Sequence, residues 1–356
     1  NEDVFSSDAT PIIPFNRILK GEKYIVQSLP GSTIDASSFL IVSTKDNSVF
    51  SITPSAKTVS GFIAGSTFNV TLDYGETILV KADNAGDLSG STVVSKNGCE
   101  KFVVFAGSKC SQSEYSSGNC TGCDHLYTQL IPVSHYGKQF YLAPFALQAG
   151  NYVAKVTASE DNTIILIDGV ALVTPLNKNE SWEYRPIAPS FKKTCIQTSK
   201  PSLLYQYLNS KGCNTNSNGN GDPSMLLIPS VDKWVRQAKF GMFNTPNVDV
   251  HHINIVAKKS TLLNIQVTAD VPFTKSFDTT LLCDEVGVLT ILATQGSFEI
   301  KSDSLFYSYV YSYVYSIGTN ESFAYLTGAK VFPYKGEYAL QSRQVCFDAQ
   351  PITLGI

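Results

Sequence analysis

Residues 156–167 read VTASEDNTIILI, in which two apolar runs flank a polar turn. β-branched residues on either side of Asp-Asn are typical of two strands joined by a tight turn. The same arrangement recurs around the turns at residues 43–48 and 257–261. No convincing amphipathic helix interrupts these runs, so the sequence predicts an all-β fold rather than alternating strands and helices.

A proline motif marks an internal repeat. Pro14, Pro132, Pro229 and Pro333 each precede a polar stretch and a new strand, at intervals of about 100 residues, the size of one β-sandwich. Near the end of each interval lies an apolar or aromatic strand, at residues 101–105, 202–207 and 304–309. We therefore predict about three tandem β-sandwich-like repeats, with a propeller-like closed arrangement as the alternative. The predicted boundaries are 1–126 (with a cysteine-rich loop), 127–224, 225–328 and a C-terminal closing segment at 329–356.

The composition favours an extracellular protein. Hydrophobic residues make up 43% of the chain and charged residues 16%, below the roughly 25% usual for soluble domains. The net charge of −3, with both signs intermixed, gives no electrostatic footprint for nucleic acid. No apolar run approaches the roughly 18 residues that span a bilayer. We expect a secreted or cell-surface protein without a membrane span.

The even cysteine count points to disulfides in an oxidising compartment. The cysteines are Cys99, Cys110, Cys120, Cys123, Cys195, Cys213, Cys283 and Cys346. Cys99 and Cys110 flank a strand roughly 20 Å long, which keeps them apart. We expect Cys110 to pair with Cys120 or Cys123. Glycosylation acceptor triplets begin at Asn69, Asn119, Asn179 and Asn320.

Each candidate metal site lacks some of the ligands that a metal ion requires. The Cys120-Thr121-Gly122-Cys123 spacing suits zinc, but no second ligand pair accompanies it. His251 and His252 are adjacent in a strand, so their side chains point to opposite faces. The loop from Asn214 to Met225 imitates a calcium loop but lacks its final Glu. We expect no metal and no cofactor.

Catalytic motifs are also missing. The sequence has no nucleophile elbow, phosphate loop or zinc-protease helix. Asp284 and Glu285 could serve a carbohydrate-active enzyme, but no second carboxylate stands at a defined separation. Gly221-Asp222-Pro223 is best interpreted as a turn. We therefore expect a protein that is not an enzyme.

The segment Tyr307–Tyr315 places five tyrosines on one face of a strand. Such a face either packs in a core or forms an exposed strip that contacts a glycan or a protein. The central Tyr311 is expected in the core. Contact with a partner is expected at Tyr307, Tyr309 and Tyr315.

Short motifs between Cys123 and Val256 resemble a known family. They are CDHL at 123–126, QLIP at 129–132, GK at 137–138, VTASEDNT at 156–163, KP at 200–201, DPSM at 222–225, IP at 228–229 and INIV at 253–256. In order and spacing they resemble the N-terminal domain of IgG-Fc-binding protein. The chain departs from the family pattern at His135-Tyr136, where tryptophan is common before the glycine, and at His251-His252. The resemblance implies a mucus-type or surface-associated binding domain, without implying that IgG is the ligand.

These observations predict a non-enzymatic extracellular module that recognises a glycoprotein, glycan or protein partner. The alternative is a structural subunit that polymerises in an extracellular matrix or filament. Its mass in dilute solution separates the two, since an assembly subunit forms ordered oligomers as its concentration rises.

Overall fold

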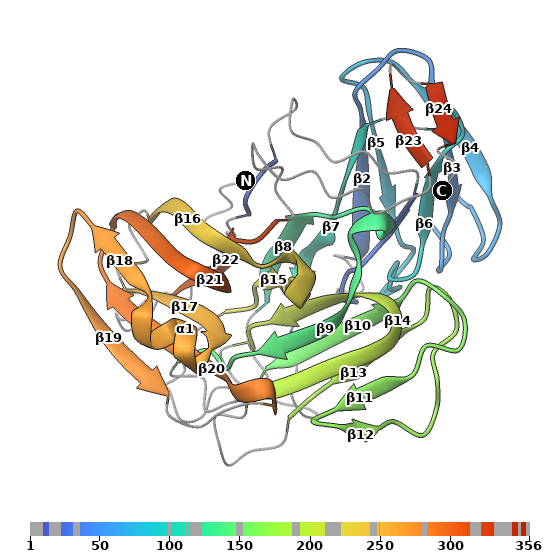
Figure 1. Ribbon diagram of the computed structural model, residues 1–356. Coiled ribbons are helices and arrows are strands. Elements are labelled where there is room, and N and C mark those ends of the chain that lie inside the picture. The colour runs from blue at the N-terminus through green and yellow to red at the C-terminus, as the bar shows by residue number, and fades with distance from the viewer. Residues whose placement is uncertain are drawn as a thin grey trace.

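A computed structural model of the chain describes most of its length, and Figure 1 shows its arrangement. The described residues are 10–13, 23–30, 36–98, 101–111, 113, 123–146, 152–186, 193–210, 222–242, 248, 250–278, 283–313, 322–330, 344–347 and 350–353. Nearly all of the regular structure is β-strand, as the alternating sequence pattern predicts.

The first unit is a sandwich of two four-stranded antiparallel sheets, β1-β6-β3-β4 and β5-β2-β7-β8. Phe39, Phe50 and Phe102 are buried between the sheets. Its strands are β1 (Lys23–Ile25), β2 (Ser37–Ser43), β3 (Ser48–Thr53), β4 (Phe68–Leu72), β5 (Thr77–Lys81), β6 (Thr92–Ser95), β7 (Phe102–Ser111) and β8 (Asp124–Gln129).

The second unit is built around one long strand, β14, whose first half pairs with β9 and β11 and whose second half pairs with β10 and β15. This strand therefore takes part in both layers of its sandwich. The elements are the 3-10 turn η2 (Val133–His135), β9 (Gly137–Leu142), β10 (Val153–Ala158), β11 (Ile165–Ile167), β12 (Val170–Ala171), β13 (Ser181–Tyr184), β14 (Thr194–Tyr207) and β15 (Met225–Leu227).

The third unit repeats this plan with an even longer central strand, β21, which pairs with β16, β17, β18 and β22. The elements are η4 (Val231–Lys233), β16 (Val235–Met242), β17 (Val250–Lys258), α1 (Lys259–Asn264), β18 (Gln266–Ala269), β19 (Phe273–Asp278), η5 (Cys283–Glu285), β20 (Val286–Ala293), β21 (Gly296–Tyr313) and β22 (Ser322–Gly328). After it, β23 (Gln344–Phe347) and β24 (Gln350–Thr353) pair with each other.

One four-stranded sheet occurs with the same strand order in every unit, and we call it the repeated sheet. Its three copies are β5-β2-β7-β8, β13-β10-β14-β15 and β20-β17-β21-β22. The predicted three tandem units are thereby confirmed, and the described strands form sandwiches rather than propeller blades. Each repeated sheet has an inner face on its own unit's core and an outer face directed away from that core.

Two predicted unit boundaries lie at closing strands, and one predicted turn is helical. The repeated sheet of the first unit ends with β8 and that of the second with β15, so the predicted boundaries at 126 and 224 fall inside or just before a closing strand. The predicted polar turn at 257–261 is the start of helix α1, because Leu262 is buried in the third core. Pro14 and Pro333 lie outside the described residues.

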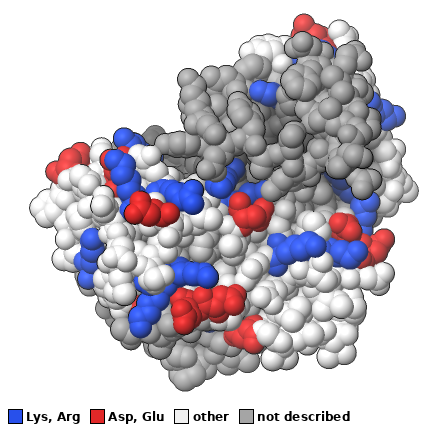
Figure 2. Space-filling view, in the orientation of Figure 1, with Lys and Arg blue, Asp and Glu red and all other residues white. Residues whose placement is uncertain are grey.

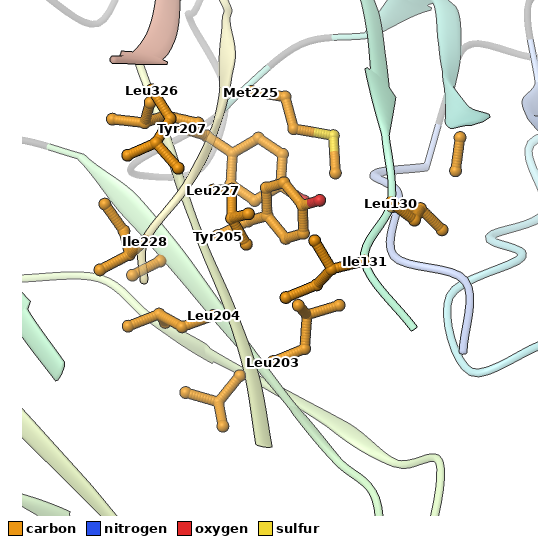
Figure 3. Packing of buried hydrophobic residues seen from close by; sticks show 14 of the residues in the cluster. Leu130, Ile131, Leu203, Leu204, Tyr205, Tyr207, Met225, Leu227, Ile228 and Leu326 are labelled. Atoms are coloured by element: carbon orange, nitrogen blue, oxygen red, sulfur yellow. The ribbon is translucent and has the colours of Figure 1, made fainter. Parts of the chain in front are cut away.

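The closing strands of the three units converge. β15 contacts both β8 and β22, and the surrounding cluster includes Ile131, Tyr205, Leu227 and Leu326, seen in Figure 3. The largest core runs without interruption through the first and second units into the tyrosines of β21. The units are therefore held together by shared core rather than by flexible linkers.

Candidate interaction surface

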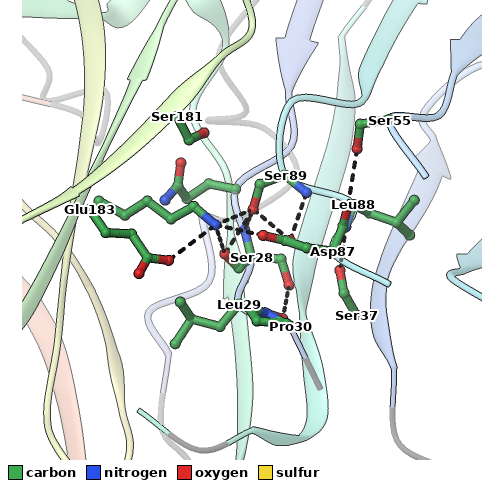
Figure 4. Close-up of polar contacts among 12 residues, drawn as sticks. Ser28, Leu29, Pro30, Ser37, Ser55, Asp87, Leu88, Ser89, Ser181 and Glu183 are labelled. Carbon is green, nitrogen blue, oxygen red and sulfur yellow. Dashed lines mark hydrogen bonds and ion pairs between the residues drawn. The ribbon is translucent and has the colours of Figure 1, made fainter. Parts of the chain in front are cut away.

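The outer face of the second repeated sheet packs on the first unit. Lys155 of β10 is at its centre, with its side chain only 4% exposed. Its Nζ donates to the Ser28 carbonyl at 3.0 Å and to Ser89 Oγ at 2.8 Å, and pairs with Asp87 Oδ2 at 2.7 Å. Figure 4 labels these three partners. A buried ammonium is tolerated when each of its donors is satisfied in this way.

The outer face of the third repeated sheet packs on the second unit through an amide instead. Asn254 Nδ2 donates to the Pro144 carbonyl at 3.2 Å and to Tyr309 Oη at 2.8 Å. Its Oδ1 accepts from Thr290 Oγ1 at 2.8 Å and from Tyr311 Oη at 3.3 Å. All four hydrogen-bonding positions of this amide are thereby used, which fixes its orientation.

The two junctions are built in the same register. Lys155 lies opposite Tyr205, and Asn254 lies opposite Tyr309. The carbonyls that they bind, those of Ser28 and Pro144, belong to equivalent segments that begin in the first strand of their unit and continue past its end. We call residues 24–30 and 140–146 the linking segments. The first unit therefore docks its linking segment on the outer face of the second unit, and the second unit docks its own on that of the third.

The strand pairings prove the equivalence of the linking segments. Tyr24 pairs with Val93, which also pairs with Ile52 of β3. Phe140 pairs with Ile196, which also pairs with Ile167 of β11. Ser28 and Pro144 stand the same number of residues after Tyr24 and Phe140.

The tyrosine ladder is the contact face of the second junction. Tyr307, Tyr309 and Tyr311 are fully buried. Tyr307 Oη donates to the Tyr141 carbonyl and Tyr309 Oη to that of Ala143 at 3.2 Å, while burial raises the pKa of all three. Tyr311 lies in the core as expected.

The prediction that Tyr307 and Tyr309 contact an outside partner is wrong, because the second unit already covers both side chains. The remaining predicted contact, Tyr315, lies outside the described residues.

The first unit presents the same outer face with nothing docked on its centre among the described residues. Leu40 stands where Lys155 and Asn254 stand, and Phe105 lies opposite it in the tyrosine position. Leu79, at the edge, corresponds to Glu183 and Thr290 and is 58% exposed. Leu40 and Phe105 are partly exposed, whereas their counterparts in the other two units are buried.

This apolar face extends beyond the sheet. Thr58 pairs with Ala82, and Val59 N donates to the Lys81 carbonyl at 3.0 Å, so Val59 continues the outer face past β5 and is 64% exposed. On the other side Phe105 stacks on Tyr127, with ring centroids 5.9 Å apart, and burial raises the pKa of Tyr127 to about 12. The candidate surface is therefore Val59, Leu79, Leu40, Phe105 and Tyr127, which we call the open face.

A comparison with protein families matches residues 8–312 to the family described as IgGFc binding protein. The chain belongs to the IgGFc binding protein family. The resemblance carried by the CDHL, QLIP and VTASEDNT motifs is thereby confirmed and extended to all three units. The comparisons with curated proteins and with solved structures gave no match. Within the described residues, no helix is long and apolar enough to cross a membrane.

Two disulfides occur among the described residues of this family member. Cys110 pairs with Cys123, one of the two expected partners, and joins β7 to the start of β8. Cys195 of β14 pairs with Cys283 of η5, with the two Cα atoms 6.4 Å apart, and ties the second unit to the third. The side chains of the other cysteines, Cys99, Cys120, Cys213 and Cys346, lie outside the described residues.

The remaining predicted residues have mainly structural surroundings. Asp284 Oδ2 accepts from Gln139 Nε2 and Tyr141 Oη, each at 2.7 Å, so this carboxylate joins the third unit to the second. Asn69 is exposed on β4. Asn179 is partly buried, and its carbonyl lies where any side chain at Gly90 would collide with it. Asn119 and Asn320, the calcium-like loop before Asp222, and Gly221 lie outside the described residues.

A cavity of about 340 Å³ opens at the edge of the second junction. It is lined by Pro144, Ala146, His252, Thr274, Ser276, Asp278, Val288, Thr290, Leu292 and Tyr311. Its two aromatic rings, His252 and Tyr311, stack on each other with centroids 5.0 Å apart and are buried. They therefore present no free ring face to a sugar.

The sequence patterns missed the linking segments and their acceptors. The clue was a polar residue inside each of two apolar strands, Lys155 in VAKVTA and Asn254 in INIVAK. Leu40 takes that place in the first repeat. Aligning the three repeats on their polar turns would have singled out this position.

Proposed function

We propose that this chain is a non-enzymatic extracellular module that binds a protein partner through the open face of its first unit. One observation carries the proposal: a neighbouring unit covers the outer face of the second and third repeated sheets, whereas no described residue docks on the centre of this face in the first unit. Exposed apolar side chains gathered on one sheet are typical of interaction sites. Membership of the IgGFc binding protein family and the two disulfides support an extracellular binding role.

The chemistry of the open face suits a protein rather than a nucleic acid or a small polar ligand. Its centre, Leu40 and Phe105, carries no charge and no hydrogen-bond donor, whereas lysine or asparagine fills the equivalent place elsewhere. Figure 2 shows basic and acidic side chains interspersed over the described part of the surface in view. A secreted glycoprotein that presents an apolar protein patch is the partner class we propose.

A polymerising subunit would use the same surface, so the chain itself belongs among the probes. The test compares Leu79→Asp with Val173→Asp, a matched change at a fully exposed valine on the second unit. Neither position is in a core, so both variants should keep the wild-type melting temperature. The immobilised proteins are presented with purified mucin, IgG Fc and the labelled chain.

We expect at least one probe to bind the wild type and Val173→Asp equally and to be lost from Leu79→Asp. A charge placed in an apolar interface typically costs tenfold or more in affinity. Equal retention of every bound probe by both variants, or binding of none of the three by the wild type, would overturn the proposal.

A further inference from the structure

We propose that copies of this chain join head to tail, with residues 238–242 of one copy, which we call the third linking segment, docked on the open face of another. The inference rests on the proposed function, because it names a second copy of the chain as a partner of that face. It starts from the two junctions inside the chain, in each of which a linking segment of one unit covers the outer face of the next.

The third unit has a linking segment of its own, in β16. Ala238 pairs with Ile300, which also pairs with Val267 of β18. The first residues of the other two linking segments are paired in the same way, each with a strand that also pairs with a third. Met242 therefore corresponds to Pro144, whose carbonyl holds the second junction.

The third linking segment is exposed where the other two are buried. Residues 25–27 and 141–143 are at most 2% exposed. Their counterparts are Lys239, which is exposed, and Phe240 and Gly241, which are partly exposed. Figure 1 shows β16 on the third unit, away from β2 and β5 of the open face. The described part of the chain thus presents both halves of a further junction without joining them.

The third unit already holds its linking segment in place. Tyr325 Oη donates to the Gly241 carbonyl at 2.7 Å. In the second unit, Gln206 Nε2 donates to the equivalent carbonyl, that of Ala143, at 2.8 Å. The Ala143 carbonyl also accepts from Tyr309 of the next unit, so a carbonyl held in this way still accepts a partner. A segment fixed before contact loses less conformational entropy when it docks.

The apolar open face suits a reversible contact between chains. Leu40 has no donor, unlike the polar residues at the two joined junctions, so the Met242 carbonyl gains no hydrogen bond there. Phe240 supplies apolar surface instead. The charge of Lys239 is already paired, because Glu299 Oε1 lies 3.0 Å from its Nζ. A contact without buried hydrogen bonds is weaker than the two internal junctions, so it should form and separate with chain concentration.

Self-association of designed variants tests this contact, in which each chain gives a segment to one neighbour and a face to another. Leu79→Asp alters the face and Phe240→Asp the segment, while Val173→Asp and Leu263→Asp change exposed residues elsewhere on the second and third units. Analytical ultracentrifugation follows assembly as the chain concentration rises. We expect both controls to assemble like the wild type, and each test variant to need at least about tenfold higher concentration.

An equal mixture of the two test variants separates head-to-tail assembly from other modes. The mixture holds one intact face and one intact segment, so we expect dimers and nothing longer. A wild type that stays monomeric would overturn the inference. Assembly that only one of the two variants weakens would also overturn it, and sensitivity to Leu79→Asp alone would mean that two open faces pair with each other.

Photo-crosslinking leaves the segment unaltered, which matters because Phe240 also stacks on Phe298 in its own unit. A benzophenone amino acid replaces Leu79 in a mixture of isotopically light and heavy chains, and trypsin releases residues 240–258 as one peptide. We expect crosslinks to this peptide that join a light chain to a heavy chain, and none from the same probe at Val173. Crosslinks only within one chain, or only to other peptides, would overturn the inference.

Binding of the external probes shows which of the two proposals fails. Phe240→Asp keeps the open face, so it should still bind any mucin or IgG Fc that the wild type binds. Loss of that binding in Leu79→Asp beside a monomeric wild type would refute this inference alone. Retention of it by Leu79→Asp beside the mixed dimers would refute the glycoprotein partner of the proposed function alone.

Discussion

The register shared by the two junctions predicts opposite effects for the same substitution at equivalent positions. Tyr205 and Tyr309 are both fully buried and occupy matching places in β14 and β21. Tyr309 Oη donates to the Ala143 carbonyl and accepts from Asn254 Nδ2. Tyr205 Oη has no hydrogen-bond partner among the described residues. Changing each tyrosine to phenylalanine removes one hydroxyl and leaves the ring packing unchanged.

The expected free energies follow from these contacts. Tyr309→Phe leaves a buried carbonyl and one amide hydrogen without their partner, which costs about 2 kcal/mol of unfolding free energy. Tyr205→Phe removes a buried hydroxyl that makes no hydrogen bond with the described residues, so the free energy of unfolding should stay the same or rise slightly. For a chain of this size, 2 kcal/mol corresponds to about 3 °C in melting temperature.

Calorimetry of the two variants beside the wild type measures the difference. We expect Tyr309→Phe to melt about 3 °C lower and Tyr205→Phe at or slightly above the wild-type temperature. Equal losses in both variants would show that the hydroxyl of Tyr309 does not hold the second junction. A larger loss in Tyr205→Phe would show that the contacts of the two tyrosines are assigned the wrong way round.

Three further perturbations test the junctions. Asp87→Ala should cost about 2 kcal/mol of unfolding free energy in urea, because it removes the charged partner of the buried Lys155. Asp83→Ala is the control: its ion pair with Lys57 has the same N–O distance of 2.7 Å, but Lys57 is exposed, so this change should cost almost nothing. Equal losses in the two variants would contradict this. Burial lowers the pKa of His252 to about 4, so between pH 6.5 and 4 the unfolded chain binds a proton at this residue and the folded chain does not. The free energy of unfolding therefore falls as the pH drops through this range. His252→Phe should flatten that part of the plot of stability against pH. Replacing Cys195 and Cys283 by alanine should cost about 3 kcal/mol, and an unchanged melt would mean that the staple between the units is dispensable.

Local patterns predicted the strands well and the assembly of units poorly. Alternation and turn residues are short-range properties, so the strands flanking Asp161-Asn162 were readable from sequence. The tyrosine ladder was recognised as one face of a strand, but which surface covers it depends on how two units dock. The pairing of Cys195 with Cys283 depends on the same long-range contact, across 88 residues of sequence. Helix α1 escaped notice because six residues are too few to show a helical period.

Oxidative footprinting of the chain with and without its bound probe shows whether a partner covers the open face. Side chains that a partner covers lose reactivity towards hydroxyl radicals. We predict protection of Leu40, Leu79 and Phe105, with Val170 and Val173 of the second unit unchanged. Protection of the second-unit valines while the three open-face residues keep their reactivity would contradict it.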